Sequence, residues 1–400
     1  MTTSRNRPGF ALAVAMFAIV VIGAIIAGAF FSSTQDYRVG RNSLMQSRAL
    51  ATAELGMNQM YESWRASQAA QGPLANRIQN RLDIGQTLSF QCPGADCGIA
   101  TAAELNGARA DVTITRLTAG TWEVTSLGVQ NPGLENETRR RTSMIVRHDT
   151  PDVNFLGAMT TRGRTTINGA ARVEGEDHNP AGWNNCDPIG APKPGLAIDE
   201  SRDVVGDKCA TGSCSGTPPV LVTGTAALDQ TYFDYGGTNW EKLKAQASKR
   251  YPSGQVLNQI DPLYNADGSC NSVALLNWGD IDRTPATASA CDGYFPIIYG
   301  MGNLTINGNT GQGILLVEGD LNVQGNFRFM GAVIVKGGLK MTGTGNHITG
   351  AVMAATVDLD DASTLVGSQI ISYSRCALTE ALQNATPPRI ATGRAWVDKL

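Results

Sequence analysis

The sequence is poor in charged residues and in histidine. Asp, Glu, Lys and Arg together make up 17% of the 400 residues, and histidine occurs only at positions 148, 178 and 347. These histidines are too few and too dispersed for a His-based catalytic or metal site. The patterns G-x-x-x-x-G-K-[ST], H-E-x-x-H, G-x-S-x-G and G-x-G-x-x-G do not occur. We therefore expect no enzyme activity, no cofactor and no metal centre.

Clustered positive charge is also missing. The formal net charge is −3, and Lys and Arg are scattered apart from the short run Arg139, Arg140 and Arg141. A nucleic-acid-binding surface needs a basic patch, so we expect no nucleic acid partner. What the chain has instead is 45 glycines and 42% hydrophobic residues, a composition typical of a β-rich protein with many tight turns.

No cysteine precedes Cys92, and the eight cysteines all lie in the rest of the chain. An even number favours disulfides formed in an oxidising compartment. Free thiols or a zinc site are the alternatives, although zinc sites commonly use C-x2-C pairs and two of the pairs here enclose four residues. Eight cysteines allow about 105 pairings. Proximity suggests Cys92 with Cys97, Cys209 with Cys214 and Cys270 with Cys291, which leaves Cys186 and Cys376 as further candidates.

A long apolar run occupies the N-terminus. Phe10 to Phe31 are 22 consecutive uncharged residues, which as a helix would span ~33 Å and cross a bilayer. The apolar region of a secretory signal peptide is usually shorter. From Tyr37 to Arg65 apolar residues recur at helical spacing, so we expect one helix over residues 10–65. The cysteines then place the long C-terminal part in the periplasm or outside the cell, on a single-pass anchor in the inner membrane.

The first residues carry a family resemblance. The opening MTTSRNRPGFALAVAMF, with Gly9 followed by Phe10 and the apolar run, resembles a type IV prepilin leader. The segment RALATAELGMNQMY, Arg48 to Tyr61, is similar to the stretch after the membrane helix of PilX-type minor pilins. The resemblance extends to about His148. It implies a leader at residues 1–9, a prepilin peptidase that cuts between Gly9 and Phe10, and a helix that packs with other pilin subunits.

One position departs from the pattern of major pilins. They carry glutamate at the fifth mature position, where it pairs with a neighbouring amino terminus, and this chain has Val14 there. Val14 cannot neutralise that amine, and an unpaired charge is costly in an apolar filament core. We therefore expect a minor, tip-located or priming role. A plain uncleaved membrane anchor is the alternative, because an apolar span alone does not reveal whether a leader is removed.

Residues 66–148 predict a pilin-like β head. Ala108 to Leu117 alternates apolar and polar residues with a period of two, as in a half-buried strand. Gly120 to Val129 and Thr138 to His148 provide two further strand-like runs. We expect an antiparallel meander on which the helix buries its apolar stripe, giving an α+β fold. The polar segment from His148 to Asn154 contains Pro151 and predicts a domain boundary.

The C-terminal half contains internal repeats. NLTINGN, DLNVQGN and GLKMTGT start at positions 303, 320 and 338, and GILLVEG, GAVIVKG and GAVMAAT start at positions 313, 331 and 350. Both series therefore share one period of about 18 residues. A fixed period of short strands and glycine turns predicts a parallel β-helix, or β-solenoid, and a β-sandwich is the alternative.

These repeats divide the C-terminal half into segments. We expect the first solenoid coils over 149–228, an insertion with a helix at Asn239–Arg250 over 229–294, and regular coils over 295–372. The last segment, 373–400, is predicted to cap the open solenoid end through a helix at Ser374–Asn384, with Cys376 fixing it in place.

Two groups of residues are candidates for a ligand site. The first comprises Asp358, Asp360 and Asp361 together with Asp280 and Asp282, because paired acids serve in glycoside hydrolysis and in Ca²⁺ binding. We interpret them as a polar solenoid face. The second is a set of aromatic residues in or near the insertion, which we interpret as local core in preference to a ligand or partner surface. They are Trp183, Trp240, Trp278, Tyr294 and Phe295.

These observations together predict a minor pilin-like structural protein of a type IV pilus or related filament. Its β-solenoid would be displayed for assembly or adhesion, at the inner membrane or on a cell-surface pilus. The alternative is a membrane-anchored surface protein whose solenoid binds or cleaves polysaccharide. Expected partners are other pilin subunits, the prepilin peptidase, the inner membrane and a surface glycan or cell ligand.

Overall fold

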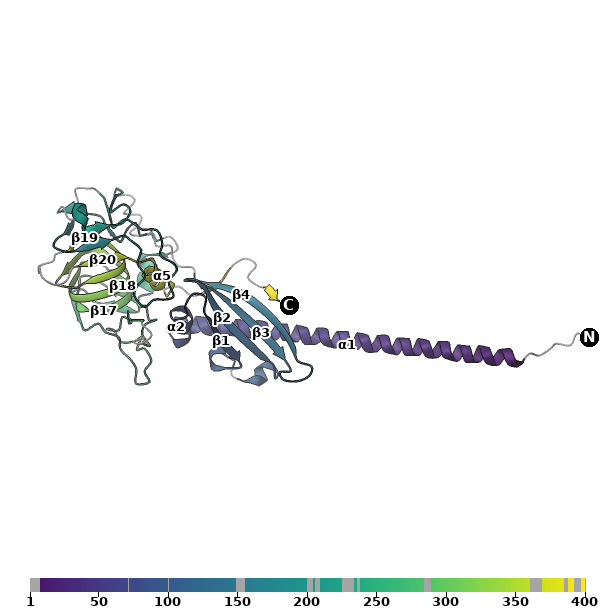
Figure 1. The fold of residues 1–400 in the computed structure, drawn as a ribbon. Helices are drawn as coiled ribbons and strands as arrows, with labels where there is room; N and C mark the ends of the chain where they lie inside the picture. Colours follow the sequence, from purple (N-terminus) through teal and green to yellow (C-terminus); the bar gives the residue numbers. More distant parts are fainter. Residues whose placement is uncertain are drawn as a thin grey trace, which may run out of the picture.

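A long helix projects from two β-rich regions in the computed structural model (Figure 1). The antiparallel strands β1 to β4 lie along this helix, and a larger, mainly parallel region lies beyond its C-terminal end. The prediction of a long apolar N-terminal helix followed by antiparallel and parallel sheets is therefore confirmed. The structure describes residues 8–70, 72–99, 101–148, 155–199, 204–205, 209–224, 234–235, 238–283, 289–359, 369–384, 388–391 and 397–399.

Helix α1 (Pro8–Ala69) is 62 residues long and has two different halves. Its side chains are exposed from Leu12 to Leu44, and only the later turns pack against protein. A short helix follows, α2 (Pro73–Gln79), which begins with a proline in its first turn after Gly72. Proline is favoured there because the first N–H groups of a helix have no intrahelical partner.

The head sheet contains four consecutive antiparallel strands in the order β1-β2-β3-β4. Buried and less buried residues alternate along β2 and β3, as the period-two pattern predicts. Helix α1 approaches β3 so closely that a Cβ added at Gly128 would lie 2.0 Å from the carbonyl oxygen of Ala49. The strands and the short 3-10 turns between β1 and β2 are β1 (Thr87–Cys92), η1 (Ala95–Cys97), η2 (Ala102–Leu105), β2 (Arg109–Thr118), β3 (Thr121–Gln130) and β4 (Thr138–Arg147).

The end of the chain returns to the head. Strands β21 (Arg389–Ile390) and β22 (Val397–Lys399) both pair antiparallel with β4, and the Tyr61 hydroxyl of α1 donates a hydrogen bond to the Pro388 carbonyl at 3.0 Å. The head is thus built from both ends of the chain, and the parallel region is inserted between them. The segment 373–400, predicted as a solenoid cap and tail, therefore contributes its last strands to a different sheet.

The predicted repeats appear as parallel strands in register. Ile297 lies opposite Ile314, Ile314 opposite Ala332, and Ala332 opposite Ala351, so each partner lies one predicted repeat further along the chain. These strands have long runs of buried residues, as expected where a parallel sheet is covered on both faces. They are β16 (Ile297–Gly300), β17 (Leu304–Val317), β18 (Leu321–Thr342), β19 (His347–Leu359) and β20 (Ile370–Tyr373).

A column of glycines stands at one bend of these strands. Gly313, Gly331 and Gly350 are in register and have φ values of 116°, 133° and 144°. A Cβ at Gly331 would lie 2.0 Å from the carbonyl oxygen of Gly313, and one at Gly350 would lie 1.9 Å from that of Gly331. Glycine is required at this column for its backbone conformation and for the close approach of successive strands.

The order of the strands in space differs from the expected order. Strands β5 to β7, predicted as the first coils, pair with β19 and β20, so they lie beside the last regular strands. The opposite edge is formed by β14 and β15, which come from the predicted insertion and pair with β16 and β17. The strands are β5 (Met159–Thr161), β6 (Thr165–Ile167), β7 (Arg172–Glu174), β8 (Leu196–Ile198), β9 (Val204–Val205), β10 (Cys214–Ser215), β11 (Val220–Val222), β14 (Lys249–Tyr251) and β15 (Gln255–Asn258).

Two predicted helices are present with different details. Helix α4 (Trp240–Ala245) is shorter than predicted, because Lys249–Tyr251 joins the parallel sheet as β14. It follows a two-strand pair, β12 (Asp234–Tyr235) and β13 (Thr238–Asn239). Helix α5 (Arg375–Gln383) begins at a Ser374 cap but contacts β17, β18 and β19. It therefore covers the side of three successive strands and not the open end of the sheet.

Candidate functional site

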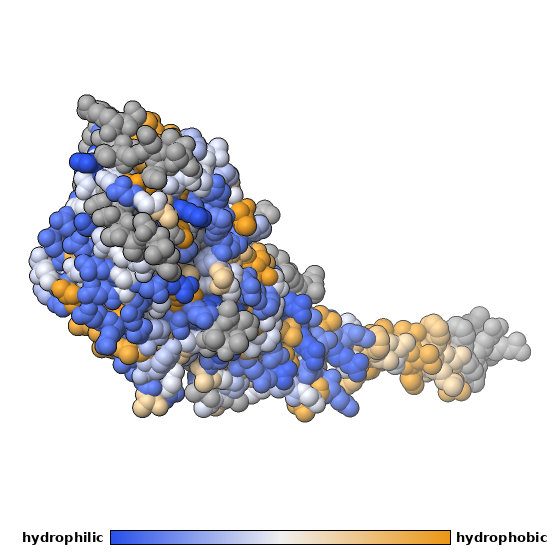
Figure 2. Space-filling view, turned by 60° about the vertical axis from the view of Figure 1, so that its left-hand side comes forward, coloured by the Kyte–Doolittle hydropathy of each residue, from blue (hydrophilic) through white to orange (hydrophobic). Residues whose placement is uncertain are grey.

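The first half of α1 is an apolar surface without a protein partner. Phe17, Ile19 and Phe30 are exposed by 71%, 70% and 73%, and no charged residue occurs between Leu12 and Phe31. Figure 2 shows hydrophobic residues along the projecting helix, in contrast to the largely hydrophilic surface of the globular part. The helix is long and apolar enough to span a membrane. This is the largest exposed apolar feature among the residues that the structure describes.

The second half of α1 is fixed firmly to the head. Met57, Met60 and Trp64 are fully buried between the helix and the sheet. Trp64 meets Trp122 of β3 edge to face, with ring centroids 5.3 Å apart. The indole nitrogen of Trp122 donates a hydrogen bond to the Ile78 carbonyl of α2 at 3.1 Å. The helix therefore holds the head at a defined distance from the exposed apolar segment.

A buried ionic cluster joins the head to the inserted region. Glu380 of α5 is fully buried, and its carboxylate lies 3.0 Å from the Arg116 guanidinium of β2 and 3.5 Å from that of Arg283. Arg116 also lies over the Trp122 ring, and Arg283 lies 3.7 Å from the Trp183 ring centroid. Burial lowers the pKa of Arg283, an effect that Glu380 and Asp292 oppose. We call Arg116, Arg283 and Glu380 the interdomain cluster.

Further polar contacts beside this cluster connect the head to the inserted region. Arg81, just after α2, pairs with the buried Asp292 at 3.1 Å. Asn80 donates to the Gly293 carbonyl at 3.1 Å, and Gln383 donates to the Ala119 carbonyl at 3.0 Å. Hydrogen bonds therefore cross from the head to two separate segments of the inserted region, the loop before β16 and helix α5.

All eight cysteines are paired. The structure joins Cys92 to Cys97, Cys209 to Cys214 and Cys270 to Cys291, the same pairs that sequence proximity suggests. The fourth disulfide links Cys186 to Cys376, across 190 residues, and ties α5 to the segment after β7.

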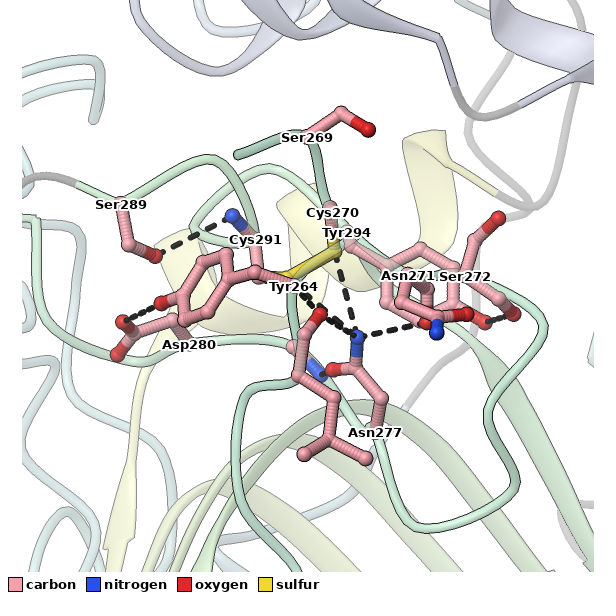
Figure 3. Close-up of a disulfide and its surroundings, with 12 residues drawn as sticks. Tyr264, Ser269, Cys270, Asn271, Ser272, Asn277, Asp280, Ser289, Cys291 and Tyr294 are labelled. Carbon is pink, nitrogen blue, oxygen red and sulfur yellow. Dashed lines mark hydrogen bonds between the residues drawn. A yellow bond between two sulfur atoms is a disulfide. The ribbon is translucent and has the colours of Figure 1, made fainter. Parts of the chain in front are cut away.

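The Cys270–Cys291 disulfide lies at the centre of a polar loop (Figure 3). The Asn277 side-chain amide donates to the Leu263 and Asn271 carbonyls at 3.0 and 2.8 Å and lies 3.4 Å from both sulfur atoms. Its oxygen accepts a hydrogen bond from the Gly279 backbone at 3.0 Å. Because its donors and acceptor are used internally, we assign Asn277 a structural role in this loop.

The aromatic residues of the second candidate group are core residues. Each is at most 4% exposed, so they do not form a ligand or partner surface. Trp278 illustrates this, because its indole nitrogen donates to the Tyr251 hydroxyl at 2.9 Å and its ring packs near Phe327 and Phe329. The five residues are Trp183, Trp240, Trp278, Tyr294 and Phe295.

Among the candidate acids whose side chains the structure describes, Asp280 and Asp282 are not part of a metal-binding group. Asp280 accepts hydrogen bonds from the Tyr264 hydroxyl and from the Asp282 backbone. Asp358 falls in β19, and Asp360 and Asp361 lie outside the described residues. Within the described ranges, no group of three His, Cys, Asp or Glu side chains is arranged to hold a metal ion.

The predicted cleavage site lies at the start of α1. Gly9 and Phe10 are in the first helical residues, and residues 1–7 of the predicted leader lie outside the described part of the chain. Removal of the leader stays a prediction. Comparisons of the chain with protein-family models, with curated proteins and with solved structures found no match.

Sequence reasoning missed the interdomain cluster, although one signal was present. Ala110, Val112 and Ile114 are inward-facing positions of β2, and Arg116 follows at the same two-residue interval. A charged residue at an inward position of a strand requires a buried partner. The identity of that partner, Glu380, is not visible from a position 264 residues away in the chain.

Proposed function

We propose that the chain is a minor pilin-like structural protein that enters a type IV pilus or a related filament. The observation that carries this proposal is the division of α1 into an exposed apolar half and a half packed into a β head. Such a helix anchors a subunit in the inner membrane before assembly. Afterwards its apolar surface is covered by the helices of other subunits, because leaving it in water is unfavourable.

Processing follows from the resemblance of residues 1–9 to a prepilin leader. A prepilin peptidase would cut between Gly9 and Phe10 and so place Val14 at the fifth mature position. Without a carboxylate there, the subunit cannot neutralise the amino terminus of a neighbour inside the filament. This supports a tip-located or priming role in preference to bulk polymerisation.

The inserted region, in this proposal, is a β-solenoid held away from the membrane. Parallel partners at a regular interval along the chain and the glycine column support this architecture. The interdomain cluster and the C-terminal strands bind it to the head, so the anchor and the displayed region move together. Display of this kind suits filament assembly or adhesion.

The proposal is tested first by the mass of the mature chain. We expect an N-terminus at Phe10 in the wild type and retention of residues 1–9 in a Gly9→Val variant. The control is Gly28→Val, a glycine of α1 with open space around it, which should be processed normally. A wild-type chain that keeps Met1, or one that begins beyond Ser32 and is freely soluble, contradicts the proposal.

Its position in the filament is tested by labelling. Antibodies against the inserted region should mark filament ends sparsely, and sheared filaments should contain far fewer copies of this chain than of the major subunit. Uniform decoration along whole filaments would contradict the minor role, and absence from filaments of a correctly processed chain would favour a plain membrane anchor.

A further inference from the structure

A cleft of about 420 Å³ lies on the outer face of the parallel sheet, and no residue of the interdomain cluster lines it. Its floor is formed by residues in register on four neighbouring strands, β18, β19, β20 and β7. Arg328 lies opposite His347 in one row, and the next row holds, in register, Met330, Thr349, Ser372 and Glu174. This volume is within the range of small-ligand sites.

The strand alternation explains why these side chains face outward. Phe329, Ile348, Ile371 and Val173 occupy the positions between them and are at most 1% exposed. Because successive residues of a strand point to opposite faces, the intervening side chains lie on the outer face, where they form the floor of the cleft. Four strands at ~4.8 Å spacing give the floor a length of roughly 14 Å.

Two segments form the walls of this cleft. One contains His178, Asn179, Pro180 and Ala181, and the other contains Ile281 and Asp282. The indole nitrogen of Trp183 joins them by donating to the Ile281 carbonyl at 3.2 Å, and the His178 backbone donates to the Tyr373 carbonyl at 3.1 Å. The Cys186–Cys376 disulfide follows directly after the first wall. The walls are therefore held before any ligand arrives, which lowers the ordering cost of binding.

The charges in the cleft oppose a strongly ionic ligand. Arg328 repels cations, whereas Glu174 and Asp282 repel anions. His347 accepts or donates hydrogen bonds with Ser372 at 2.9 Å and with Thr349 at 3.3 Å. Burial, followed by the nearby Arg328 and His178, lowers the pKa of His347, so its ring is neutral at neutral pH. Donors and acceptors of both kinds thus surround the cleft without a dominant charge.

We propose that this cleft binds a neutral, linear saccharide. A sugar offers hydroxyl groups that both donate and accept, which matches the accessible polar lining formed by Arg328, Asn179, Asp282 and Glu174. The elongated row across β18, β19, β20 and β7 favours several linked units over a single sugar. This inference adds the ligand class to the adhesion role of the proposed function, but it does not require that the chain enters a filament.

The test uses the full chain purified in a zwitterionic detergent without a sugar headgroup. Binding is measured by titration calorimetry against soluble neutral oligosaccharides of one to six units, with uronate-containing oligosaccharides of the same lengths as a second arm. We expect at least one neutral series to bind, with affinity that rises with length and then levels off. Failure of every neutral series at millimolar concentration, or binding confined to the uronates, overturns the proposal.

Two variants and one control assign binding to this cleft. Arg328→Ala removes an exposed donor and should weaken binding about tenfold or more. Ala181 is an exposed residue of the first wall, so the larger side chain of Ala181→Trp should fill the adjoining part of the cleft and abolish binding. Lys340→Ala changes an exposed cation on the same strand outside the cleft and should leave affinity unchanged. Equal affinity of Arg328→Ala, Ala181→Trp and the wild type would show that the saccharide binds elsewhere and overturn the assignment. Because these measurements need no filaments, their failure is distinct from failure of the pilin proposal.

Discussion

The two sheets of this protein use buried positions in different ways. In the antiparallel head sheet, buried residues alternate with less buried ones, and α1 covers the buried face. In the parallel sheet, runs such as Ile314 to Val317 are buried without interruption. Glycine also differs in its role: Gly128 lets a helix approach a strand, whereas Gly331 lets one strand stack on the next. The head is thus stabilised by packing between helix and sheet, and the parallel region by strands that pair in register, one beside the next.

The largest effect is expected for Gly331→Ala in the parallel region. The new Cβ would meet the Gly313 carbonyl oxygen at 2.0 Å in a backbone conformation that alanine rarely adopts. We expect a loss of about 4 kcal/mol or more in the free energy of unfolding, measured by denaturant titration. Gly254→Ala is the control, since Gly254 also has a positive φ of 78° but open space around it, and it should cost about 1–2 kcal/mol. Equal effects would refute the steric role of the column.

The head counterpart is Gly128→Ala. Its Cβ would lie 2.0 Å from the Ala49 oxygen and 2.5 Å from the Ala53 nitrogen, so α1 must move away from β3. We expect about 3 kcal/mol of destabilisation, with faster amide hydrogen exchange in the head than in the parallel strands. Gly40→Ala, on an open face of the same helix, should be neutral or slightly stabilising. Uniformly faster exchange in both regions would mean that the two sheets unfold as one unit.

Glu380→Gln tests how the two regions are joined. The substitution keeps the shape of the side chain but leaves the buried Arg116 and Arg283 without their shared anion. We expect a loss of about 3 kcal/mol in the free energy of unfolding, because removing one partner of a buried ion pair leaves a buried charge uncompensated. Glu241→Gln, which alters an exposed ion pair, should change stability by less than about 0.5 kcal/mol. A similarly small effect for Glu380→Gln would show that the cluster does not hold the joint.

A smaller effect is expected from pH, through Lys249 at the edge of the parallel sheet. Its ammonium group donates to the Ser272 and Ala274 carbonyls at 2.6 Å, and burial lowers its pKa from 10.5 to about 8. Between these two pH values the unfolded chain binds more protons than the folded one, so stability rises with pH.

This contribution is measurable by substitution. Deprotonation of Lys249 should raise the free energy of unfolding of the wild type by about 2 kcal/mol between pH 7.5 and 9.5, measured by denaturant titration. Lys249→Met has no titrating group at this position, so its rise over the same interval should be smaller by that amount. If the free energy of unfolding changed with pH in the same way for the wild type and Lys249→Met, Lys249 would not be the group responsible.

Local sequence patterns predicted many of the strands of this fold, but they did not predict which strands pair when these lie far apart in the chain. Period-two alternation predicted the strand that became β2, strand-like runs predicted β3 and β4, and the repeat spacing predicted the partners of β17, β18 and β19. The repeat predicts the number of residues between paired strands. It does not predict at which edge of the regular strands the earlier strands β5 to β7 pair, and we had expected them to precede β16 and not to lie beside β19 and β20. The two-residue strand β21 is too short for any periodicity to reveal.

Of the candidate functional surfaces, the sequence predicted the one formed by consecutive residues and missed the one that depends on long-range strand pairing. The apolar half of α1 is a property of consecutive residues, and the sequence predicted it directly. The cleft proposed to bind a saccharide is formed by strands whose residues lie far apart in the chain, such as Glu174 and Ser372. Their alignment follows only once β7 is paired with β20, and the sequence pattern had placed that strand elsewhere.

The return of the chain to β4 makes the inserted parallel region exchangeable in principle. Because Arg389 is paired with Arg147, the points where the chain leaves the head and re-enters it are neighbours on adjoining strands. A different module can occupy the interval without altering the chain path of the head, provided that it supplies a buried anion for Arg116 in place of Glu380. For the proposed filament subunit, exchange of this one module is then a route to new surface specificities.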